Sequence, residues 1–175
     1  SAVVAVAPFG LPLDPAPWDE FAARTSIPVV IDAAAAFDAT RVGAAPVVVS
    51  MHATKTVCAG EGGFVATTDP DLARRVKRTA NFGFFGARVA EVAGLNAKLS
   101  EYHAAVGLAS LAQWPARRAE YLAAGARLRA ALEPLGCTFL EGFAERWVGS
   151  TCVLRLPPGR HAADVALALG LEGVA

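Results

Sequence analysis

Short apolar strands that alternate with helical segments constrain this chain more than any other feature of its sequence. Apolar, β-branched runs occur at residues 2–7, 27–31, 46–50 and 63–67. Helical character is expected over residues 18–24, and Asp69 is a typical N-cap for a second helix. Strands interleaved with helices are typical of an α/β domain, so we expect a mainly parallel sheet flanked by helices.

The second half of the chain changes to a predominantly helical pattern. Ala, Leu and Tyr recur at helical spacing over residues 99–132, and Pro115 predicts a bend or the start of a new helix. Two short strands are expected at 137–140 and 151–156, before an Ala- and Leu-rich helix that begins near His161. This order of elements indicates the start of a small α+β domain.

These patterns predict a division of the chain into two parts. We expect residues 1–115 to form part of a large α/β domain, and residues 116–175 to form a connecting helix and part of a small C-terminal domain. The sequence begins inside an expected strand and contains Met51 as its only methionine. We therefore expect the chain to be a piece of a longer protein, truncated at both ends.

The composition excludes several classes of protein. Hydrophobic residues make up 54% of the chain and charged residues 18%, which favours a buried core over disorder. The 16 basic residues balance the 16 acidic ones without any basic run, so neither nucleic acid nor a membrane is an expected partner. No apolar run approaches the ~20 residues of a membrane helix.

The cysteines indicate a compartment rather than a site. Cys58, Cys137 and Cys152 are odd in number and far apart in the sequence. This spacing predicts neither a disulfide framework nor a metal site, and it favours a cytoplasmic location.

Three polar residues follow the expected strands 27–31 and 46–50. Asp32 comes directly after the first strand, Ser50 ends the second, and Lys55 follows in the segment SMHATKTVCAGEGG. The carboxyl ends of parallel strands share the edge at which ligands bind. A desolvated lysine can attack a carbonyl, a carboxylate can keep a ring nitrogen protonated, and hydroxyl groups bind phosphate. These are the requirements of pyridoxal phosphate.

Each of these residues also has an ordinary structural interpretation. Lys55 can be a surface lysine, Asp32 can cap a turn, and Ser50 can bind the local backbone. The GEGG segment precedes an expected strand, so it is not a dinucleotide-binding fingerprint, and Glu61 with its glycines shapes a turn. His52 can be either a packed, hydrogen-bonded side chain or a substrate contact.

The sequence resembles the DegT/DnrJ/EryC1/StrS family of sugar aminotransferases, within the fold-type-I pyridoxal-phosphate enzymes. The resemblance is carried by IDAAAAFDA, by SMHATKTVCAGEGG and by GLNAKLSEYHAAVGLASL. It covers most of this chain but only the middle of a typical family member. It implies a large cofactor-binding domain of the pyridoxal-phosphate transferase type over residues 1–115.

The resemblance also implies a role for four residues. Lys55 corresponds to the Schiff-base lysine, which also shuttles the proton between substrate and cofactor. Asp32 corresponds to the partner of the pyridine nitrogen, and Ser50 to a phosphate ligand. Asn96 corresponds to an asparagine that reaches the cofactor phosphate of the neighbouring subunit, although it can also be a helix cap. A shared site of this kind implies a homodimer.

The sequence departs from the family pattern at one position near the cofactor. The fourth residue of the family's D-A-A-Q/H pattern is polar, whereas this chain has Ala35 there. The change removes a side-chain hydrogen bond near the ring but leaves Schiff-base formation untouched. Lysine at position 55 argues against the sugar dehydratases of the family, which carry histidine there. The family's phosphate loop and ring-stacking aromatic residue would lie upstream of residue 1, so we expect this chain alone to have an incomplete site.

The function that the resemblance implies is pyridoxal-phosphate-dependent transfer of an amino group. The donor would be an amino acid such as glutamate, and the acceptor a keto-sugar, in nucleotide-linked form. One alternative is amination of a cyclitol-type ring on the same scaffold. Another is a catalytically incomplete fragment or degenerate homologue that serves as a dimerisation or regulatory module, which Ala35 favours and the four matched residues oppose.

Two further groups of residues keep alternative interpretations. Glu101 and His103 are expected on a helix, as structural residues or near a dimer interface. The aromatic set can be a substrate-side loop or ordinary core, and it consists of Phe82, Phe84 and Phe85.

Overall fold

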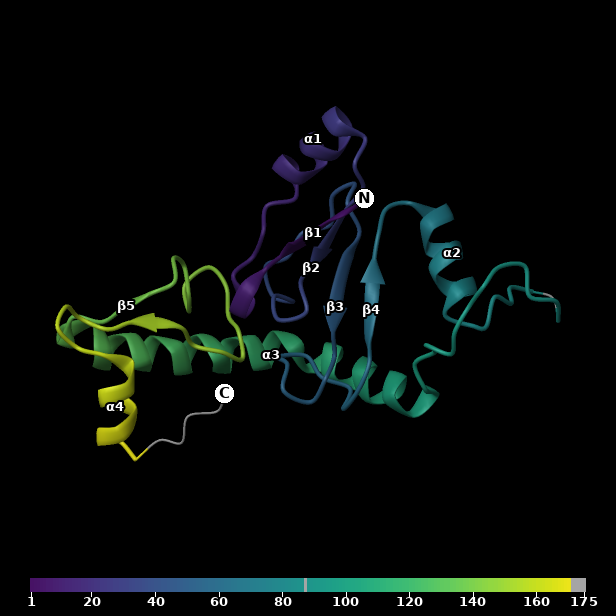
Figure 1. The fold of residues 1–175 in the computed structure, drawn as a ribbon. Coiled ribbons are helices and arrows are strands. Elements are labelled where there is room, and N and C mark those ends of the chain that lie inside the picture. Colours follow the sequence, from purple (N-terminus) through teal and green to yellow (C-terminus); the bar gives the residue numbers. More distant parts are fainter. Residues whose placement is uncertain (87, 171–175) are drawn as a thin grey trace.

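The computed structural model describes residues 1–86 and 88–170. Its central sheet has the order β1-β2-β3-β4 (Figure 1), and the strands are β1 (Val3–Val6), β2 (Val29–Asp32), β3 (Val47–Ser50) and β4 (Gly63–Ala66). The pairs β1–β2 and β2–β3 are parallel, and β4 runs antiparallel to β3. The expected mainly parallel α/β sheet is therefore confirmed. The antiparallel step joins β3 to β4, at one edge of the sheet.

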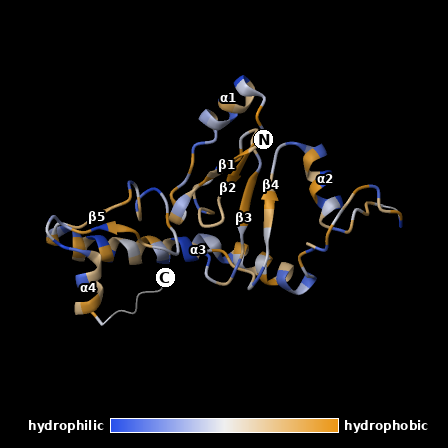
Figure 2. Cartoon of the chain, viewed as in Figure 1, coloured by the Kyte–Doolittle hydropathy of each residue, from blue (hydrophilic) through white to orange (hydrophobic). Residues whose placement is uncertain are grey.

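One face of the sheet packs against helix α1 (Ala16–Thr25) and holds the core. Ala5, Ile31 and Val47 are nearly inaccessible there, and Trp18 and Phe21 of α1 pack against them. The strands are mainly hydrophobic (Figure 2), as strands of a parallel sheet usually are, although β2 and β3 end in Asp32 and Ser50.

The opposite face of the sheet is open in this structure. Val4 and Val6 are 62% and 54% exposed, and Val48 and Val65 are 37% exposed each. Successive side chains of a strand point to opposite faces, so the same short strands produce one buried and one exposed apolar surface.

A short helix and a long helix follow the sheet. Helix α2 (Pro70–Thr79) begins at Asp69, as expected, because the carboxylate accepts the backbone N–H groups of Asp71 and Leu72 at 2.8 and 3.1 Å. Helix α3 (Glu101–Leu132) begins at Ser100, whose hydroxyl accepts the N–H of His103 at 3.2 Å. It passes beneath the lower ends of β3 and β4 and continues under the C-terminal hairpin (Figure 1).

Helix α3 continues through Pro115, so no new helix starts there. Tertiary contacts fix the helix on both sides of the proline. Trp114 packs edge-on against Phe37 at 5.3 Å between ring centroids, and Arg118 binds Asp38 at 2.7 Å. These contacts offset the hydrogen bond that a proline removes from a helix interior.

The C-terminal part contains the expected strands and helix in shorter form. After the 3-10 turn η2 (Glu133–Leu135) come β5 (Thr138–Phe139), its antiparallel partner β6 (Leu154–Arg155) and α4 (Ala162–Ala168). The loop between β5 and β6 packs back on the first part, where Trp147 lies close to Gly10. The division at residue 115 remains a prediction.

Candidate cofactor site

The register of the sheet brings Asp32 and Ser50 to the same edge. Asp32 is the last residue of β2 and is paired with Val48 of β3, and Ser50 lies two residues further along β3. Paired residues and residues two apart on one strand share a face, so both side chains lie on the same face of the sheet. Both are half-buried.

Asp32 begins a tight turn of small residues. Its Oδ1 accepts the backbone N–H of Ala34 at 3.0 Å, and the N–H of Ala36 binds the carbonyl of Ala33 at 2.9 Å. A Cβ on Gly10 would lie 3.0 Å from the carbonyl oxygen of Ala35, so a backbone segment packs directly against this turn. The turn-capping bond and a role toward a cofactor are compatible, since a carboxylate has several acceptor positions.

Lys55 lies on a loop that its own backbone hydrogen bonds close. The N–H of Met51 binds Gly62 at 2.8 Å, the N–H of Ala53 binds Gly60 at 2.8 Å, and the N–H of Lys55 binds the carbonyl of His52 at 2.9 Å. Gly60 and Gly62 have φ values of 87° and 106°, which glycine adopts without strain. The loop therefore presents Lys55, half-buried, beyond the edge where β3 ends.

Helix α3 supports this loop from below. The N–H of Cys58 donates to the hydroxyl of Ser110 at 3.2 Å. Gly107 lets Met51 approach the helix, because a Cβ at position 107 would lie 2.8 Å from the Met51 methyl group. His103 packs on Gly60, with its ring 3.3 Å from the position of an added Cβ. The position of Lys55 thus depends on the first half of α3.

His52 contacts several other residues of the loop. Its Nδ1 lies 3.2 Å from the N–H of Thr54 and 2.8 Å from the Thr54 hydroxyl. Its Nε2 lies 3.7 Å from a carboxylate oxygen of Glu61 in the GEGG turn. The Ser50 hydroxyl accepts the N–H of His52 at 3.2 Å. These contacts correspond to the hydrogen-bonded interpretation of His52, with 45% of its side chain exposed.

Asn96 lies apart from the strand-end residues, on the exposed segment that precedes α3. It forms an antiparallel bridge with Asn81, and its Oδ1 accepts the ammonium of Lys98 at 2.7 Å. It does not cap α3, because Ser100 has that position. Its expected role toward the cofactor of another subunit remains a prediction.

Two of the three aromatic residues of this region are exposed, whereas Phe84 is half-buried. Phe82 and Phe85 are 47% and 37% exposed, and Lys98 lies 4.2 Å above the Phe82 ring. Of the two helix residues, His103 packs on the lysine loop and Glu101 is exposed in the first turn of α3. A role of these residues at a subunit interface stays a prediction.

Asp38 is a buried polar residue that the sequence analysis did not single out. Its side chain is 3% exposed, its Oδ1 accepts Arg118 Nε at 2.7 Å, and its Oδ2 accepts the N–H of Val148 at 3.0 Å. The signal in the sequence was the second acidic residue of IDAAAAFDA, six residues after Asp32. Asp38 joins the turn after β2 to α3 and to the loop between β5 and β6.

The described residues contain no cluster of three or more His, Cys, Asp or Glu side chains that could hold a metal ion. No described helix is long and apolar enough to cross a membrane. An amine, a carboxylate and a hydroxyl at one sheet edge fit pyridoxal phosphate in kind, since they match its aldehyde, its ring nitrogen and its phosphate.

A family model of the DegT/DnrJ/EryC1/StrS aminotransferase family matches residues 1–156. The chain belongs to this family. Its structure matches that of DesI, crystallised in the presence of its TDP-sugar product, with a TM-score of 0.75 and 32% identity over 97% of this chain and 46% of DesI. This agreement supports the expected pyridoxal-phosphate transferase fold.

Two curated relatives match parts of the chain. The dTDP-3-amino-3,4,6-trideoxy-alpha-D-glucose transaminase of Streptomyces venezuelae is 38% identical over 135 residues, which are 69% of this chain and 36% of the relative. Protein Rv3402c of Mycobacterium tuberculosis is 41% identical over 101 residues, which are 54% of this chain and 24% of the relative. The chain therefore spans about a third or less of the length of these curated relatives and about half of that of DesI.

Proposed function

We propose that this chain belongs to a pyridoxal-phosphate-dependent aminotransferase that transfers an amino group from an amino acid such as glutamate to a nucleotide-linked keto-sugar. The observation that carries the proposal is the placement of Asp32, Ser50 and the Lys55 loop at one edge of a mainly parallel sheet. Family membership supports the reaction type, and the sugar transaminases among its relatives support the substrate class. Amination of a cyclitol-type ring remains the alternative within this family.

The cofactor, when bound, supplies an electron sink that stabilises negative charge at the substrate carbon. Asp32, as a carboxylate, would hold a proton on the ring nitrogen and so keep the ring electron-poor. Ser50 Oγ would donate a hydrogen bond to the phosphate. Lys55 Nζ would hold the cofactor covalently until the substrate amine replaces it, and the freed amine would then carry a proton to and from the substrate carbon.

The contacts between the Lys55 loop and α3 support this role of Lys55. The loop of Lys55 is closed by its own backbone and rests on Gly107 and Ser110. This support fixes the backbone position of Lys55, and correct positioning of a reacting group contributes several kcal/mol to a reaction, on the order of 7–11 in favourable cases.

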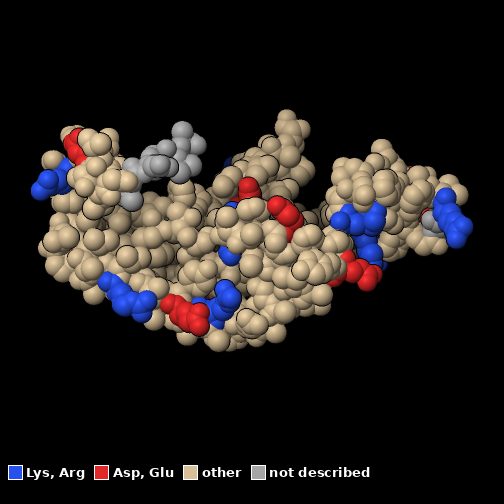
Figure 3. Space-filling model, turned by 90° about the horizontal axis from the view of Figure 1, so that it is seen from below, with Lys and Arg blue, Asp and Glu red and all other residues tan. Residues whose placement is uncertain are grey.

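The proposal includes a homodimer with shared sites. Residues 102–116 of α3 contain no Asp, Glu, Lys or Arg, and Tyr102 and Leu108 are 76% and 68% exposed. Charged side chains are sparse over the face of the molecule seen in Figure 3. We assign a second copy to this helix face, because Asn96 lies just before it and would then reach the neighbouring cofactor.

Covalent labelling tests the cofactor assignment. The protein, expressed from its complete reading frame, is incubated with pyridoxal phosphate, reduced with borohydride and mapped by peptide mass. We expect the label on Lys55, with Lys77 and Lys98 unmodified as internal controls. The variant Lys55→Arg keeps the charge and should lose the label together with amino transfer. Label on another lysine, or equal activity of the variant, would overturn the assignment.

Sedimentation tests the assembly. The wild-type holoenzyme should sediment as a dimer, and Leu108→Glu, which places a charge on the exposed face of α3, should shift it toward monomer. Arg127→Glu, on an exposed position further along the same helix, is the matched control. A fully active holo monomer would refute the shared site. A further variant, Asn96→Ala, should weaken cofactor retention while Lys55 can still be labelled.

A further inference from the structure

Two glycines of the loop that carries Lys55 are covered by side chains from the start of α3. A Cβ on Gly60 would lie 3.3 Å from Cδ2 and 3.5 Å from Nε2 of the His103 ring. A Cβ on Gly62 would overlap with Cδ1 of Leu99, the residue before the cap of α3. Leu99 and His103 therefore cover the same turn, at two positions that are two residues apart in the sequence.

Each covered glycine is hydrogen-bonded to the segment that leads to Lys55. The carbonyl of Gly62 accepts the N–H of Met51 at 2.8 Å. The carbonyl of Gly60 accepts the N–H of Ala53 at the same distance, and Ala53 lies two residues before Lys55. Hydrogen bonds weaken steeply away from their preferred distance and angle, so a shift of the glycine turn also moves the backbone that carries Lys55.

The orientation of the His103 ring is set by the cap of its own helix. Nδ1 of the ring lies 2.8 Å from the hydroxyl of Ser100, which also accepts the backbone N–H of His103 at 3.2 Å. The same Ser100 side chain thus caps α3 and orients the half-buried ring. A ring that is held at Nδ1 presents its Cδ2 and Nε2 atoms to Gly60.

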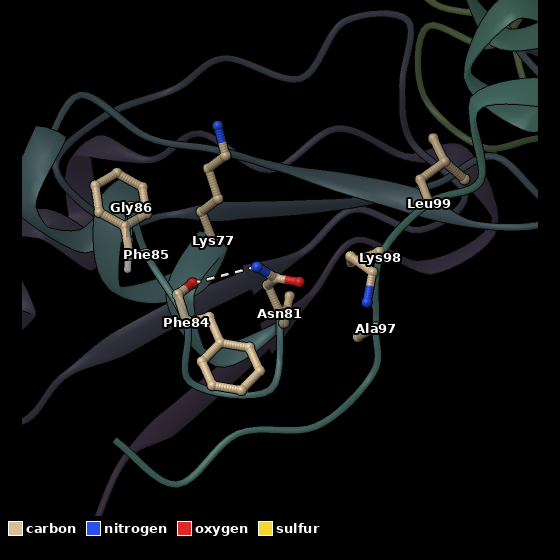
Figure 4. Close-up of a pocket in the computed structure, with 9 residues that line it drawn as sticks. Lys77, Asn81, Phe84, Phe85, Gly86, Ala97, Lys98 and Leu99 are labelled. Carbon is tan, nitrogen blue, oxygen red and sulfur yellow. Dashed lines mark hydrogen bonds between the residues drawn. The ribbon is translucent and has the colours of Figure 1, made fainter. Parts of the chain in front are cut away.

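Hollow space adjoins the two contacts. Leu99 and His103 line a cavity of about 290 Å³ together with Glu61 and Lys98. Leu99 also borders a larger cavity of about 450 Å³ between α2 and the segment before α3 (Figure 4), where Lys77 and Lys98 are among the lining residues. Protein interiors are normally close-packed, so a turn beside such spaces depends strongly on the few side chains that contact it.

We propose that His103, together with Leu99, is a positioning residue that fixes the loop of Lys55 and so the place from which its amine reacts. The inference rests on the proposed function, because Lys55 is the residue that would hold the cofactor. His103 acts through Gly60 and Ala53, without touching the reacting atoms. Displacement of a reacting group by about 1 Å can lower a rate by about two orders of magnitude, so the loss of such a contact has a measurable effect on the chemistry.

Two substitutions of His103 separate its contact with Gly60 from its bond to Ser100. Asparagine can place an amide near the position of Nδ1 and keep the bond to Ser100, but it is too short to reach Gly60. Glutamine reaches the position of Nε2 and keeps the contact with Gly60. His103→Asn should therefore release the loop, whereas His103→Gln should retain it. Leu99→Ala, which removes the contact with Gly62, is an independent second variant.

Hydrogen exchange followed by mass spectrometry tests the contact itself, in the protein expressed from its complete reading frame and without pyridoxal phosphate. Peptides that cover residues 51–55 should exchange about tenfold faster in His103→Asn and in Leu99→Ala than in wild type, while peptides of β2 exchange at the wild-type rate. Exchange in His103→Gln should stay within about threefold of wild type. Gly125→Ala is the matched control, because it perturbs the same helix where the helix packs on Ala144, and it should leave residues 51–55 unchanged.

The rate at which pyridoxal phosphate attaches to Lys55 tests the consequence for the chemistry. Samples are reduced with borohydride at successive times after the cofactor is added, and the label is mapped by peptide mass. The label on Lys55 should form at least about tenfold more slowly in His103→Asn, return to within about threefold of wild type in His103→Gln, and form at the wild-type rate in Gly125→Ala. Circular dichroism verifies that the variants are folded.

The possible outcomes separate a positioning role from general stabilisation of the fold. Wild-type exchange or wild-type attachment in His103→Asn, or losses in His103→Gln as large as those in His103→Asn, would overturn the proposal. Equal losses in Gly125→Ala would also overturn it, because any weakening of α3 would then have the same effect. Failure here with an intact Lys55 label in wild type refutes this inference alone, whereas the expected exchange pattern without that label refutes the proposed function alone.

Discussion

The carboxylate of Asp38 holds three parts of the chain together. Its two oxygens bind Arg118 of α3 and the backbone of Val148, which lie 80 and 110 residues away in the sequence. Its side chain is 3% exposed, whereas that of Arg118 is 34% exposed. A carboxylate in this position costs desolvation energy that only its partners offset, so the contacts depend on one another.

The first prediction concerns this residue. Asp38→Ala should lower the free energy of unfolding by about 2 kcal/mol, because it leaves a partly buried guanidinium and a buried N–H without their acceptor. Urea denaturation measures the loss. Asp71→Ala removes the exposed partner of Arg74 on α2 and should cost about 0.5 kcal/mol or less. Equal free energies of unfolding of the two variants would mean that the contacts of Asp38 with Arg118 and Val148 do not stabilise the fold.

The sequence predicts the strand-end residues better than their partners. Asp32 and Ser50 could be placed at one edge because each ends an apolar strand, and parallel strands end together. The contacts of Asp38 could not be predicted, because they join residues that only the packing of α3 brings together. The cavity that Lys77 and Lys98 line could not be predicted from the sequence for the same reason, because it forms between α2 and the segment before α3.

At the scale of the elements, the residue that caps the N-terminus of α2 is a titratable carboxylate, Asp69. The N–H groups of Leu72 and Asp71, which bind the Asp69 carboxylate, hold its pKa below its ordinary value. A carboxyl whose pKa is lower in the folded than in the unfolded chain stabilises the fold above the unfolded pKa of about 3.9. This stabilisation is lost as the pH falls through the lower, folded pKa.

The second prediction follows from the lowered pKa of Asp69 in the folded chain. Asp69→Asn keeps an oxygen acceptor but no charge, so it should unfold at a lower temperature than wild type at pH 6. The two midpoints should converge over the acidic range, as the pH falls below about 3.9 and through the lower, folded pKa of Asp69. Asp69→Ala has no acceptor and should remain less stable at both ends of this range. A constant gap between wild type and the Asn variant would contradict the role of the charge.

The third prediction concerns the two buried glycines of α3. Alanine favours a helix over glycine by about 1 kcal/mol at either position. A Cβ at position 125 would lie 2.3 Å from the Cβ of Ala144, whereas at position 107 it would meet the movable end of Met51 at 2.8 Å. Gly125→Ala should therefore lower the free energy of unfolding by about 1–2 kcal/mol, and Gly107→Ala should be near neutral. The reverse order in urea denaturation would contradict this packing.

Helix α3 also shows where local patterns stop being informative. Its extent was close to the helical pattern expected over residues 99–132, but Asn96 and not Ser100 was considered as its cap, and Pro115 indicated a bend or a second helix. The sequence around the proline does not reveal Phe37 and Asp38, which pack on either side of it. Contacts between distant segments decided the path of the helix there, against the local preference.

At the scale of the whole molecule, the sheet has one covered and one open face. Helix α1 covers Ile31 and Val47, and α3 crosses below the sheet toward the C-terminal hairpin (Figure 1). The alternation of apolar strands with helices predicted a mainly parallel sheet, but a run of valines has the same appearance whichever face is covered. The order of the strands and the antiparallel direction of β4 came from the structure alone.

The last prediction compares one substitution on the two faces. Valine and threonine have the same shape and similar preference for strands, so Val→Thr tests only the burial of a hydroxyl group. Val47→Thr, at a position 1% exposed, should lower the free energy of unfolding by about 2 kcal/mol, whereas Val4→Thr, at a position 62% exposed, should change it by less than about 0.5 kcal/mol. The double variant Val4→Thr/Val6→Thr should also reduce fluorescence of an apolar dye bound to residues 1–175, because it makes part of the exposed patch polar. In the protein expressed from its complete reading frame, a loss at Val4 as large as that at Val47 would mean that another part of the assembly covers this face.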